Sequence, residues 1–368
     1  MKLRLILNTI VPLLLLTLLS PWAFSQPSAE TDRSGVLIMA HGGSEDWNRA
    51  VEAVVEPLRE HYPVEIAFGM AKTSTLKAAV ERLEAQGVDR IAVVRMFISG
   101  SSFLDKTEYI LGLRESLGGE AGHSMPAVTA PHTAPDTSPQ KAPHGSPKKM
   151  PKGKPHTPGM KGMPGTHAKE AGEGHGKMDM SEGMGGSMMM EPPVPLESDA
   201  TFFISTKGVG ESPLIDDILL ARVEALSIEP STEAIMILAH GPGDDAENKQ
   251  WLIDMERRAD RLSELGPFVE IRCETLREDW PGRRAEAEKR IRAFVKAQDE
   301  AGVRVLVVPF RVAGFGPYGE VLEGLDYTAD GLGFSPHPNM TRWLDQTARA
   351  ILPSLPGAGL DQPTPHAN

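Results

Sequence analysis

The sequence predicts an α/β protein made of two similar lobes, each a small parallel sheet flanked by helices. Two observations lead to this prediction. Short apolar strands alternate with amphipathic helices along the chain, which is the pattern of parallel sheets joined by right-handed crossovers. The same order of segments also occurs twice, and each copy opens with a strand that ends in Ala-His-Gly, at His41 and at His240.

Each copy is expected to contain strand, helix, strand, helix and strand in that order. In the first copy these segments are residues 35–42, 47–61, 64–68, 75–86 and 90–97. In the second copy they are residues 234–241, 249–265, 269–273, 283–300 and 303–310. The two sets match in order and length, so the sequence indicates an internal duplication.

A short strand and a helix that starts at Ser-Pro close each copy, over residues 202–226 and 327–351. In the first half this closing unit follows a stretch of different composition. That stretch, residues 119–198, is therefore interpreted as an insertion inside domain one. The resulting boundaries are 35–118 plus 199–230 for domain one and 231–354 for domain two.

The insertion is rich in histidine and methionine. Between residues 123 and 190 lie six of the eleven histidines and ten of the seventeen methionines, with almost no aliphatic or aromatic residue. Such a composition cannot bury a core, so a disordered tether is predicted. Imidazole and thioether groups suit copper, cobalt or nickel. Metal buffering and a plain solvated linker both remain open.

The N-terminus has the three-part plan of a secretory signal peptide. Lys2 and Arg4 precede an apolar run over 5–19, and Ala23 and Ser25 are the small residues of a cleavage site. The run is short for a membrane span. A signal peptide over residues 1–25 and a periplasmic location are expected, with an uncleaved anchor as the alternative.

Composition excludes several classes of function. The chain has 38 Lys and Arg against 50 Asp and Glu, a net charge of −12, which argues against nucleic-acid binding. Its single cysteine, Cys273, rules out an internal disulfide framework and a cysteine-cluster metal site. Neither a glycine-rich phosphate loop nor a nucleophile elbow is present. No organic cofactor is expected.

The two Ala-His-Gly segments, 38–42 and 237–241, resemble the first-strand motif of the class II tetrapyrrole chelatases. These are the CbiX-type sirohydrochlorin cobaltochelatases and their siroheme ferrochelatase relatives. Residues 68–76, the run from Gly87 and the Ser-Pro helix starts are also similar to that family. The resemblance implies two chelatase-like lobes facing each other across a cleft. It further implies a lyase that inserts a divalent metal, with cobalt favoured over iron or nickel, into a sirohydrochlorin-type tetrapyrrole.

This chemistry needs a ligand that delivers the metal ion and a base that takes up two pyrrole protons, and neutral imidazole can serve as either. His41 and His240 follow the first strand of each copy, at the edge where parallel α/β sheets bind ligands. Both are predicted as catalytic residues and metal ligands, with Glu274 as a further metal ligand. The alternative is a structural histidine at the end of a strand.

The chain departs from the family pattern after the third strand, where that pattern places a second histidine. Ser102 stands near this position in the first half, and the second half has no histidine there. Met70 occupies a position that is often acidic in the family. Metal affinity depends on ligand number and geometry, so these changes favour weak binding. The alternative function is a non-catalytic periplasmic metal-binding or tetrapyrrole-carrying protein that uses the insertion.

A sirohydrochlorin-type substrate is a polycarboxylate and needs local positive charge. Arginine can hold a carboxylate through two parallel hydrogen bonds. The predicted substrate-binding residues are Lys72, Arg95, Ser102, Arg272 and Arg311. Further strand-end candidates are Lys106, Lys207 and Arg277.

Overall fold

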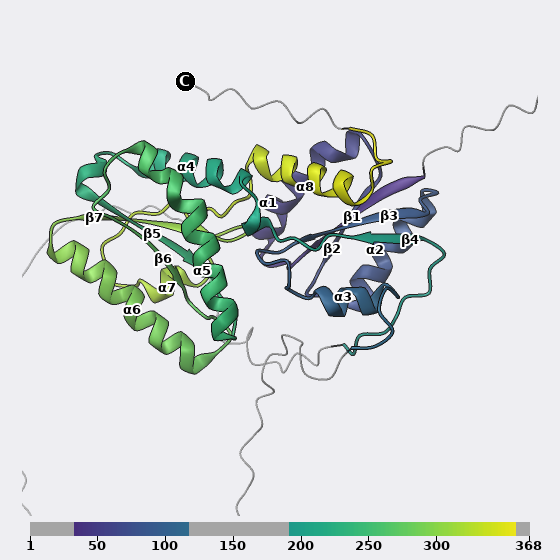
Figure 1. The fold of residues 1–368 in the computed structure, drawn as a ribbon, viewed down its shortest axis with the longest axis horizontal. Helices are drawn as coiled ribbons and strands as arrows, with labels where there is room; N and C mark the ends of the chain where they lie inside the picture. The colour runs from purple at the N-terminus through teal and green to yellow at the C-terminus, as the bar shows by residue number, and fades with distance from the viewer. Residues whose placement is uncertain (1–32, 118–190, 358–368) are drawn as a thin grey trace, which may run out of the picture. The chain divides into compact units, whose positions relative to one another are not determined.

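The computed structural model describes residues 33–117 and 191–357, shown in colour in Figure 1. The predicted signal peptide, residues 1–25, and most of the predicted insertion lie outside the described residues. Among the residues that are described, none of the helices combines the length and apolar character that crossing a membrane requires.

The first lobe contains a four-stranded parallel sheet in the order β2-β1-β3-β4. Its strands are β1 (Ser34–Ala40), β2 (Val64–Phe68), β3 (Arg90–Met96) and β4 (Thr201–Ile204). Every residue of β1 is buried, as expected for a central strand covered on both faces. This burial explains why β1 is an almost uninterrupted apolar run.

The second lobe repeats this arrangement with a parallel sheet in the order β6-β5-β7. Its strands are β5 (Glu233–Ala239), β6 (Glu270–Thr275) and β7 (Arg304–Phe310). The counterpart of β4 is reduced to an isolated parallel bridge between Leu306 and Thr328. The predicted α/β class with two parallel sheets flanked by helices is confirmed, and the strand order supports the duplication.

In the first lobe, alternate residues of β1 contribute to two cores on opposite faces of the sheet. Leu37 and Met39 join the core beneath α2 (Thr73–Ala85) and α3 (Leu104–Ile110). Val36, Ile38 and Ala40 join the core on the other face. That face is covered by α1 (Glu45–Val55), with the 3₁₀ turn η1 (Glu56–Glu60), and by α8 (Pro338–Ile351).

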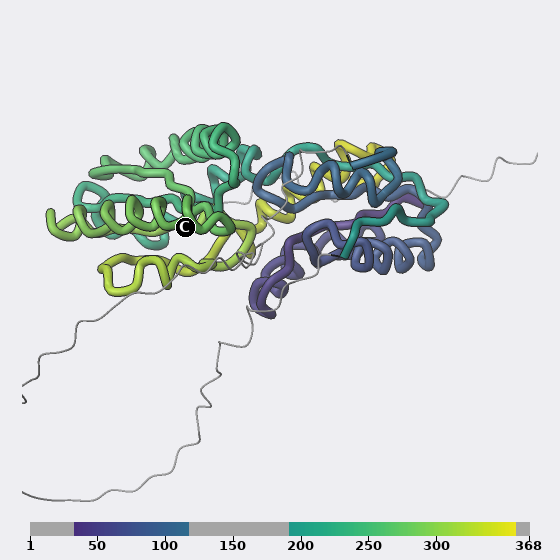
Figure 2. The backbone as a smooth tube through the Cα atoms, turned by 90° about the horizontal axis from the view of Figure 1, so that it is seen from below, coloured from purple at the N-terminus to yellow at the C-terminus, as the bar shows by residue number. Residues whose placement is uncertain are grey.

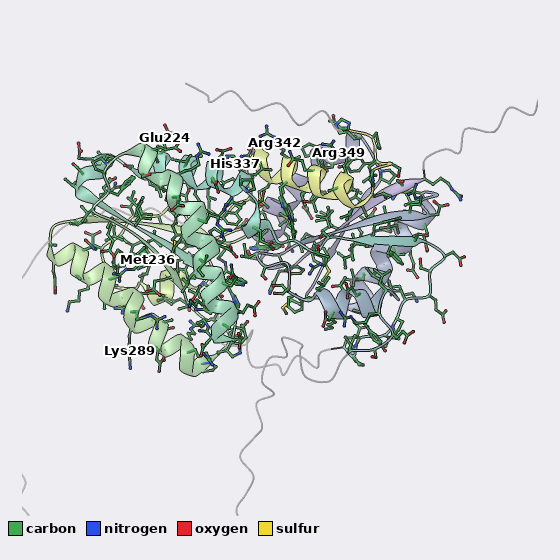
Figure 3. The ribbon with its side chains drawn as sticks, viewed as in Figure 1. Glu224, Met236, Lys289, His337, Arg342 and Arg349 are labelled. Atoms are coloured by element: carbon green, nitrogen blue, oxygen red, sulfur yellow. The ribbon has the colours of Figure 1, made fainter. Side chains whose placement is uncertain are left out.

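The second lobe has the same three layers. Met236, labelled in Figure 3, belongs to the core shared with α6 (Pro281–Glu300) and α7 (Tyr318–Val321). The opposite face carries α4 (Leu214–Leu226) and α5 (Asp245–Ala259), and α5 continues into the 3₁₀ turn η5 (Asp260–Leu265).

The two closing helices are exchanged between the lobes. Helix α4 contacts α5, η5 and β7 of the second lobe, whereas α8 contacts β3, α1 and η1 of the first. Figure 2 shows the yellow C-terminal segment running beside the blue elements of the first lobe. The predicted boundaries, which gave 199–230 to domain one and 231–354 to domain two, differ from this packing of the two helices. The repeat shows which segments are equivalent but not which sheet each helix covers.

The predicted end of the insertion at residue 198 also needs correction. The Leu196 N–H donates to the carbonyl of Ile110 at 2.7 Å, and the Val194 N–H donates to the Thr73 hydroxyl at 3.1 Å. The Ser198 hydroxyl donates to Glu84 at 2.6 Å. These contacts tie residues 194–198 to the first lobe, so this stretch belongs to the fold.

A buried polar cluster fastens α8 to the first lobe. Asp345 is fully buried and accepts a hydrogen bond from the Tyr62 hydroxyl at 3.1 Å. It also accepts two from Arg349, at 2.9 and 2.6 Å (Arg349 is labelled in Figure 3). Burying this carboxylate is tolerable because all of these donors converge on it.

We expect Asp345→Ala to lower the free energy of unfolding by about 2–3 kcal/mol, because it leaves the Tyr62 hydroxyl and the Arg349 guanidinium without their shared acceptor. Urea denaturation monitored by circular dichroism measures this loss. Glu224→Ala on the exposed face of α4 is the matched control and should change stability by less than about 0.5 kcal/mol. Equal effects of the two substitutions would contradict the anchoring role.

Candidate active site

Each candidate histidine is placed by a backbone turn that requires glycine. Gly42 and Gly241 follow the histidines with φ values of 80° and 76°, in the left-handed region. The turn also packs closely on the neighbouring strand, since a Cβ at Gly241 would lie 2.6 Å from the Cβ of Thr275. Ala-His-Gly is therefore a packing requirement that fixes each histidine at the carboxyl edge of its sheet.

Both imidazole rings have the same local bonds. The Nδ1 atoms of His41 and His240 each lie 2.7 Å from the carbonyl oxygen of the following glycine, to which Nδ1–H donates. This leaves Nε2 of a neutral ring with its lone pair available for a metal ion or a proton. Trp47 and Trp280 stand edge-on to the two rings at centroid distances of 6.4 and 6.3 Å.

In the second lobe two carboxylates face His240. Its Nε2 lies 3.0 Å from Asp279 Oδ2 and 4.0 Å from Glu278 Oε2. The chain reaches this position through Arg277, which has a φ of 58° and donates its N–H to the His240 carbonyl at 2.7 Å. The loop that carries the acids is thus bonded to the backbone of the histidine that they face.

The pKa values of this group show that it is electrostatically coupled. Burial lowers the pKa of His240, but the hydrogen bond that its Nε2–H donates to Asp279 and the charges of Glu278 and Asp279 outweigh burial, so the net direction is upward. The pKa of Asp279 is lowered, first by its bond to His240 and also by the charges of His41 and Arg311. The charge of His41 in the first lobe thus also acts on this carboxylate of the second lobe.

Arg311 holds the second carboxylate in place. It follows β7, forms an ion pair with Glu278 Oε1 and lies 3.5 Å from the Tyr318 hydroxyl. Tyr318 is fully buried, and burial raises its pKa. Among the predicted substrate-binding residues, Arg311 is the one that is bonded to a carboxylate facing His240, that of Glu278. Its contacts give it a positioning role, since it fixes one oxygen of Glu278 and leaves Oε2 facing the imidazole.

Arg95 was predicted to bind substrate, and its contacts contradict this. It is 1% exposed and donates to the backbone carbonyls of Ser205, Ser102 and Gly100 at 2.8, 2.6 and 2.5 Å. Burial lowers its pKa to about 10. Arg95 is a structural support for the loop after β3, and the Ser102 carbonyl is one of its acceptors.

Two more predicted residues lie in local pairs on β6. Arg272 is bonded to Glu270 at 2.7 Å and stacks over the Phe294 ring at 4.3 Å. Glu274 pairs with Arg290 at 3.4 Å, and burial raises its pKa. The structure therefore does not bring Glu274 to His240 as a metal ligand. Lys72 is exposed immediately before α2, at the same edge of the first sheet as His41.

Sequence reasoning missed Glu278 and Asp279 because it placed the acidic position too early in the second copy. In the sheets, Thr275 pairs with Ala239 as Phe68 pairs with Ala40. This register makes Arg277 the counterpart of Met70, and the acids follow directly after it. The sequence feature that indicates these two acids is a pair of adjacent carboxylates just beyond the second strand of the second copy.

The arrangement can hold a proton or a transiently bound cation between His240 and Asp279. Within residues 33–117 and 191–357, no three His, Cys, Asp or Glu side chains are grouped so that they could hold a metal ion.

The chain is similar to known proteins in sequence and in fold. The CbiX family model matches residues 35–113. The structure of SirB from Bacillus subtilis with Fe3+ has a TM-score of 0.50 at 13% identity, covering 87% of this chain and 96% of that one. A second structure, the sirohydrochlorin chelatase SirB from Bacillus subtilis subspecies spizizenii in complex with cobalt, has a TM-score of 0.43 at 14% identity, covering 86% and 94%. A search of curated protein sequences gives no match. The family model confirms the resemblance to the class II chelatases over the first lobe, and the first SirB structure shares its fold with 87% of this chain.

We expect Asp279→Asn to lower the pKa of His240, because the substitution removes the carboxylate that stabilises the imidazolium. The neutral imidazole, the form that binds metal, should then persist to lower pH in the variant than in the parent chain. NMR titration of the His240 ring measures both midpoints.

Glu274→Gln is the control for this experiment, since its carboxylate is bonded to Arg290. It should leave the His240 midpoint unchanged. A shift as large as that of Asp279→Asn would show that the titration does not report the bond between His240 and Asp279.

Proposed function

We propose that this chain, which resembles the class II tetrapyrrole chelatases, inserts a divalent metal ion into a sirohydrochlorin-type tetrapyrrole. The observation that carries the proposal is the bond of 3.0 Å between His240 Nε2 and Asp279 Oδ2, on a carboxylate that also feels the charge of His41. This group can exchange a proton for a metal ion.

The metal ion is delivered from the second lobe. With His240 neutral, its Nε2 and the Asp279 carboxylate bind the incoming cation, and Glu278 Oε2 at 4.0 Å from Nε2 adds negative charge beside it. Imidazole and carboxylate ligands accept cobalt, nickel and iron alike. Cobalt is favoured only by the resemblance to the cobaltochelatases.

The two pyrrole protons need two acceptors. His41 Nε2 takes one proton, since Nδ1 of this ring is bonded to the Gly42 carbonyl and Nε2 keeps its lone pair. His240 takes the other as it releases the metal, and its imidazolium is then stabilised by Asp279. One metal dication enters the macrocycle and two protons remain on the protein, so charge balances.

This assignment places the principal ligand in the second lobe. The first lobe has Met70 and Ser102 at the positions where the family pattern has an acid and a second histidine. The second lobe has two acids beside its histidine. We therefore assign metal delivery to His240 and Asp279 and a supporting role as base to His41.

The proposed site of action is the periplasm, supported by the N-terminal pattern alone. Cell fractionation with an antibody against the folded part of the chain tests it, and recovery of the protein with cytoplasmic markers would overturn it.

We expect purified protein to accelerate metallation of sirohydrochlorin by Co²⁺, Fe²⁺ or Ni²⁺, each assayed separately by its absorption spectrum. His240→Ala should reduce the rate at least about 100-fold, because it removes a ligand and a base together, and His41→Ala about 10-fold or more. His61→Ala, at an exposed position after η1, is the matched control and should keep the parent rate.

A chain that binds metal or macrocycle without exceeding the protein-free rate of metallation would contradict catalysis and favour the carrier function. Deletion of residues 123–190 then separates the two functions further. An enzyme keeps its turnover after the deletion, whereas a carrier that uses the His and Met residues loses its binding.

A further inference from the structure

A cavity of about 480 Å³ lies between the first lobe and α5. Its first-lobe wall is the loop after β3, residues 98–101, with Thr206 and Lys207 after β4. Strand β3 pairs with β1 so that Met96 lies opposite Ala40, and the loop therefore leaves the sheet at the same edge as His41. The cavity is thus beside the candidate active site, one strand away from its first histidine.

The acids that line the cavity are already supplied with donors. Glu211 accepts from the Gly208 and Gly100 N–H groups at 2.8 and 3.2 Å. Glu247 accepts from the Ser101 hydroxyl at 2.9 Å, and Asp254 accepts from Gln250 at 3.2 Å. These carboxylates are therefore poorly suited to bind a cationic ligand.

Some donors that line the cavity have no hydrogen-bond acceptor among the described residues. The indole Nε1–H of Trp251 is buried and finds no acceptor there. The ammonium group of Lys207 is exposed, and no bond joins it to a described residue. Arg258 also lines the cavity with a buried Nη1 that makes no hydrogen bond, but its charge is balanced by Asp216 at 3.1 Å. An N–H donor buried without an acceptor is costly, and an anionic ligand would remove that cost.

The remaining lining is apolar. Ile98, Met255 and Phe310 contribute to it, and the latter two are buried. An apolar floor with an ammonium group and an indole N–H suits a short hydrocarbon arm that ends in a carboxylate. A tetrapyrrole of the sirohydrochlorin type carries several such arms around its rim.

We propose that this cavity is a subsite for one peripheral carboxylate arm of the macrocycle, bound by Lys207 and by the Trp251 indole N–H. This inference rests on the proposed function, because the same macrocycle places its ring nitrogens near the histidines. It assigns substrate recognition to residues outside the His240 group, whereas Arg95 and Arg272 are held in structural contacts.

The test measures binding of metal-free sirohydrochlorin by quenching of protein fluorescence, so that it does not depend on metallation. Lys207→Gln and Trp251→Phe should each raise the Kd about five- to tenfold, since each removes one donor and keeps most of the side-chain volume. Lys249→Gln, an exposed position of α5 that does not line the cavity, is the matched control and should keep the parent Kd.

Esterification of the substrate's carboxylates gives a second test of the subsite. The methyl ester should bind the parent chain more weakly and should no longer distinguish it from Lys207→Gln. A parent chain that binds sirohydrochlorin while both variants bind equally well would overturn the subsite alone. A parent chain that binds no sirohydrochlorin would overturn the proposed function together with the subsite.

Discussion

The turn that follows each first strand is the constraint on which the candidate site depends. Gly42 and Gly241 adopt left-handed φ values in close contact with the neighbouring strand, and a side chain at Gly241 would collide with Thr275. The carbonyl of each glycine then receives the Nδ1–H of the histidine before it. One backbone geometry therefore sets the position, the orientation and the reactive nitrogen of both imidazoles. In the second lobe, Glu278 and Asp279 are then placed beside an imidazole that is already fixed.

Much of the fold could be predicted because buried parallel strands are continuous apolar runs. Residues 235–239 are all apolar, which predicts a strand that is buried on both faces, and the repeated Ala-His-Gly marks the end of that strand. The destinations of α4 and α8 could not be predicted in this way. Each has an apolar face that fits either sheet, so the choice depends on long-range contacts such as that between Tyr62 and Asp345.

The site was predicted less completely than the fold. Both histidines could be found because each is repeated in an equivalent position. Asp279 could not, because it has no equivalent in the first copy and its place depends on the left-handed backbone at Arg277. Arg95 was misjudged because a buried arginine and a substrate-binding arginine look alike in sequence. The two copies thus share a scaffold, but the second has Glu278 and Asp279 beside its histidine where the first has Ala71 and Lys72.

The exchange of helices has a consequence for how the chain acquires its structure. The core on one face of the first sheet includes Met340, Leu344 and Ala348, which come from the far end of the chain. The first lobe therefore cannot complete the burial of that face until almost all of the polypeptide has been synthesised. Contacts so distant in sequence impose a large loop-closure entropy and slow folding. Nascent chains consequently expose apolar surface on the first sheet throughout synthesis of the second half, and the two lobes reach their final state together.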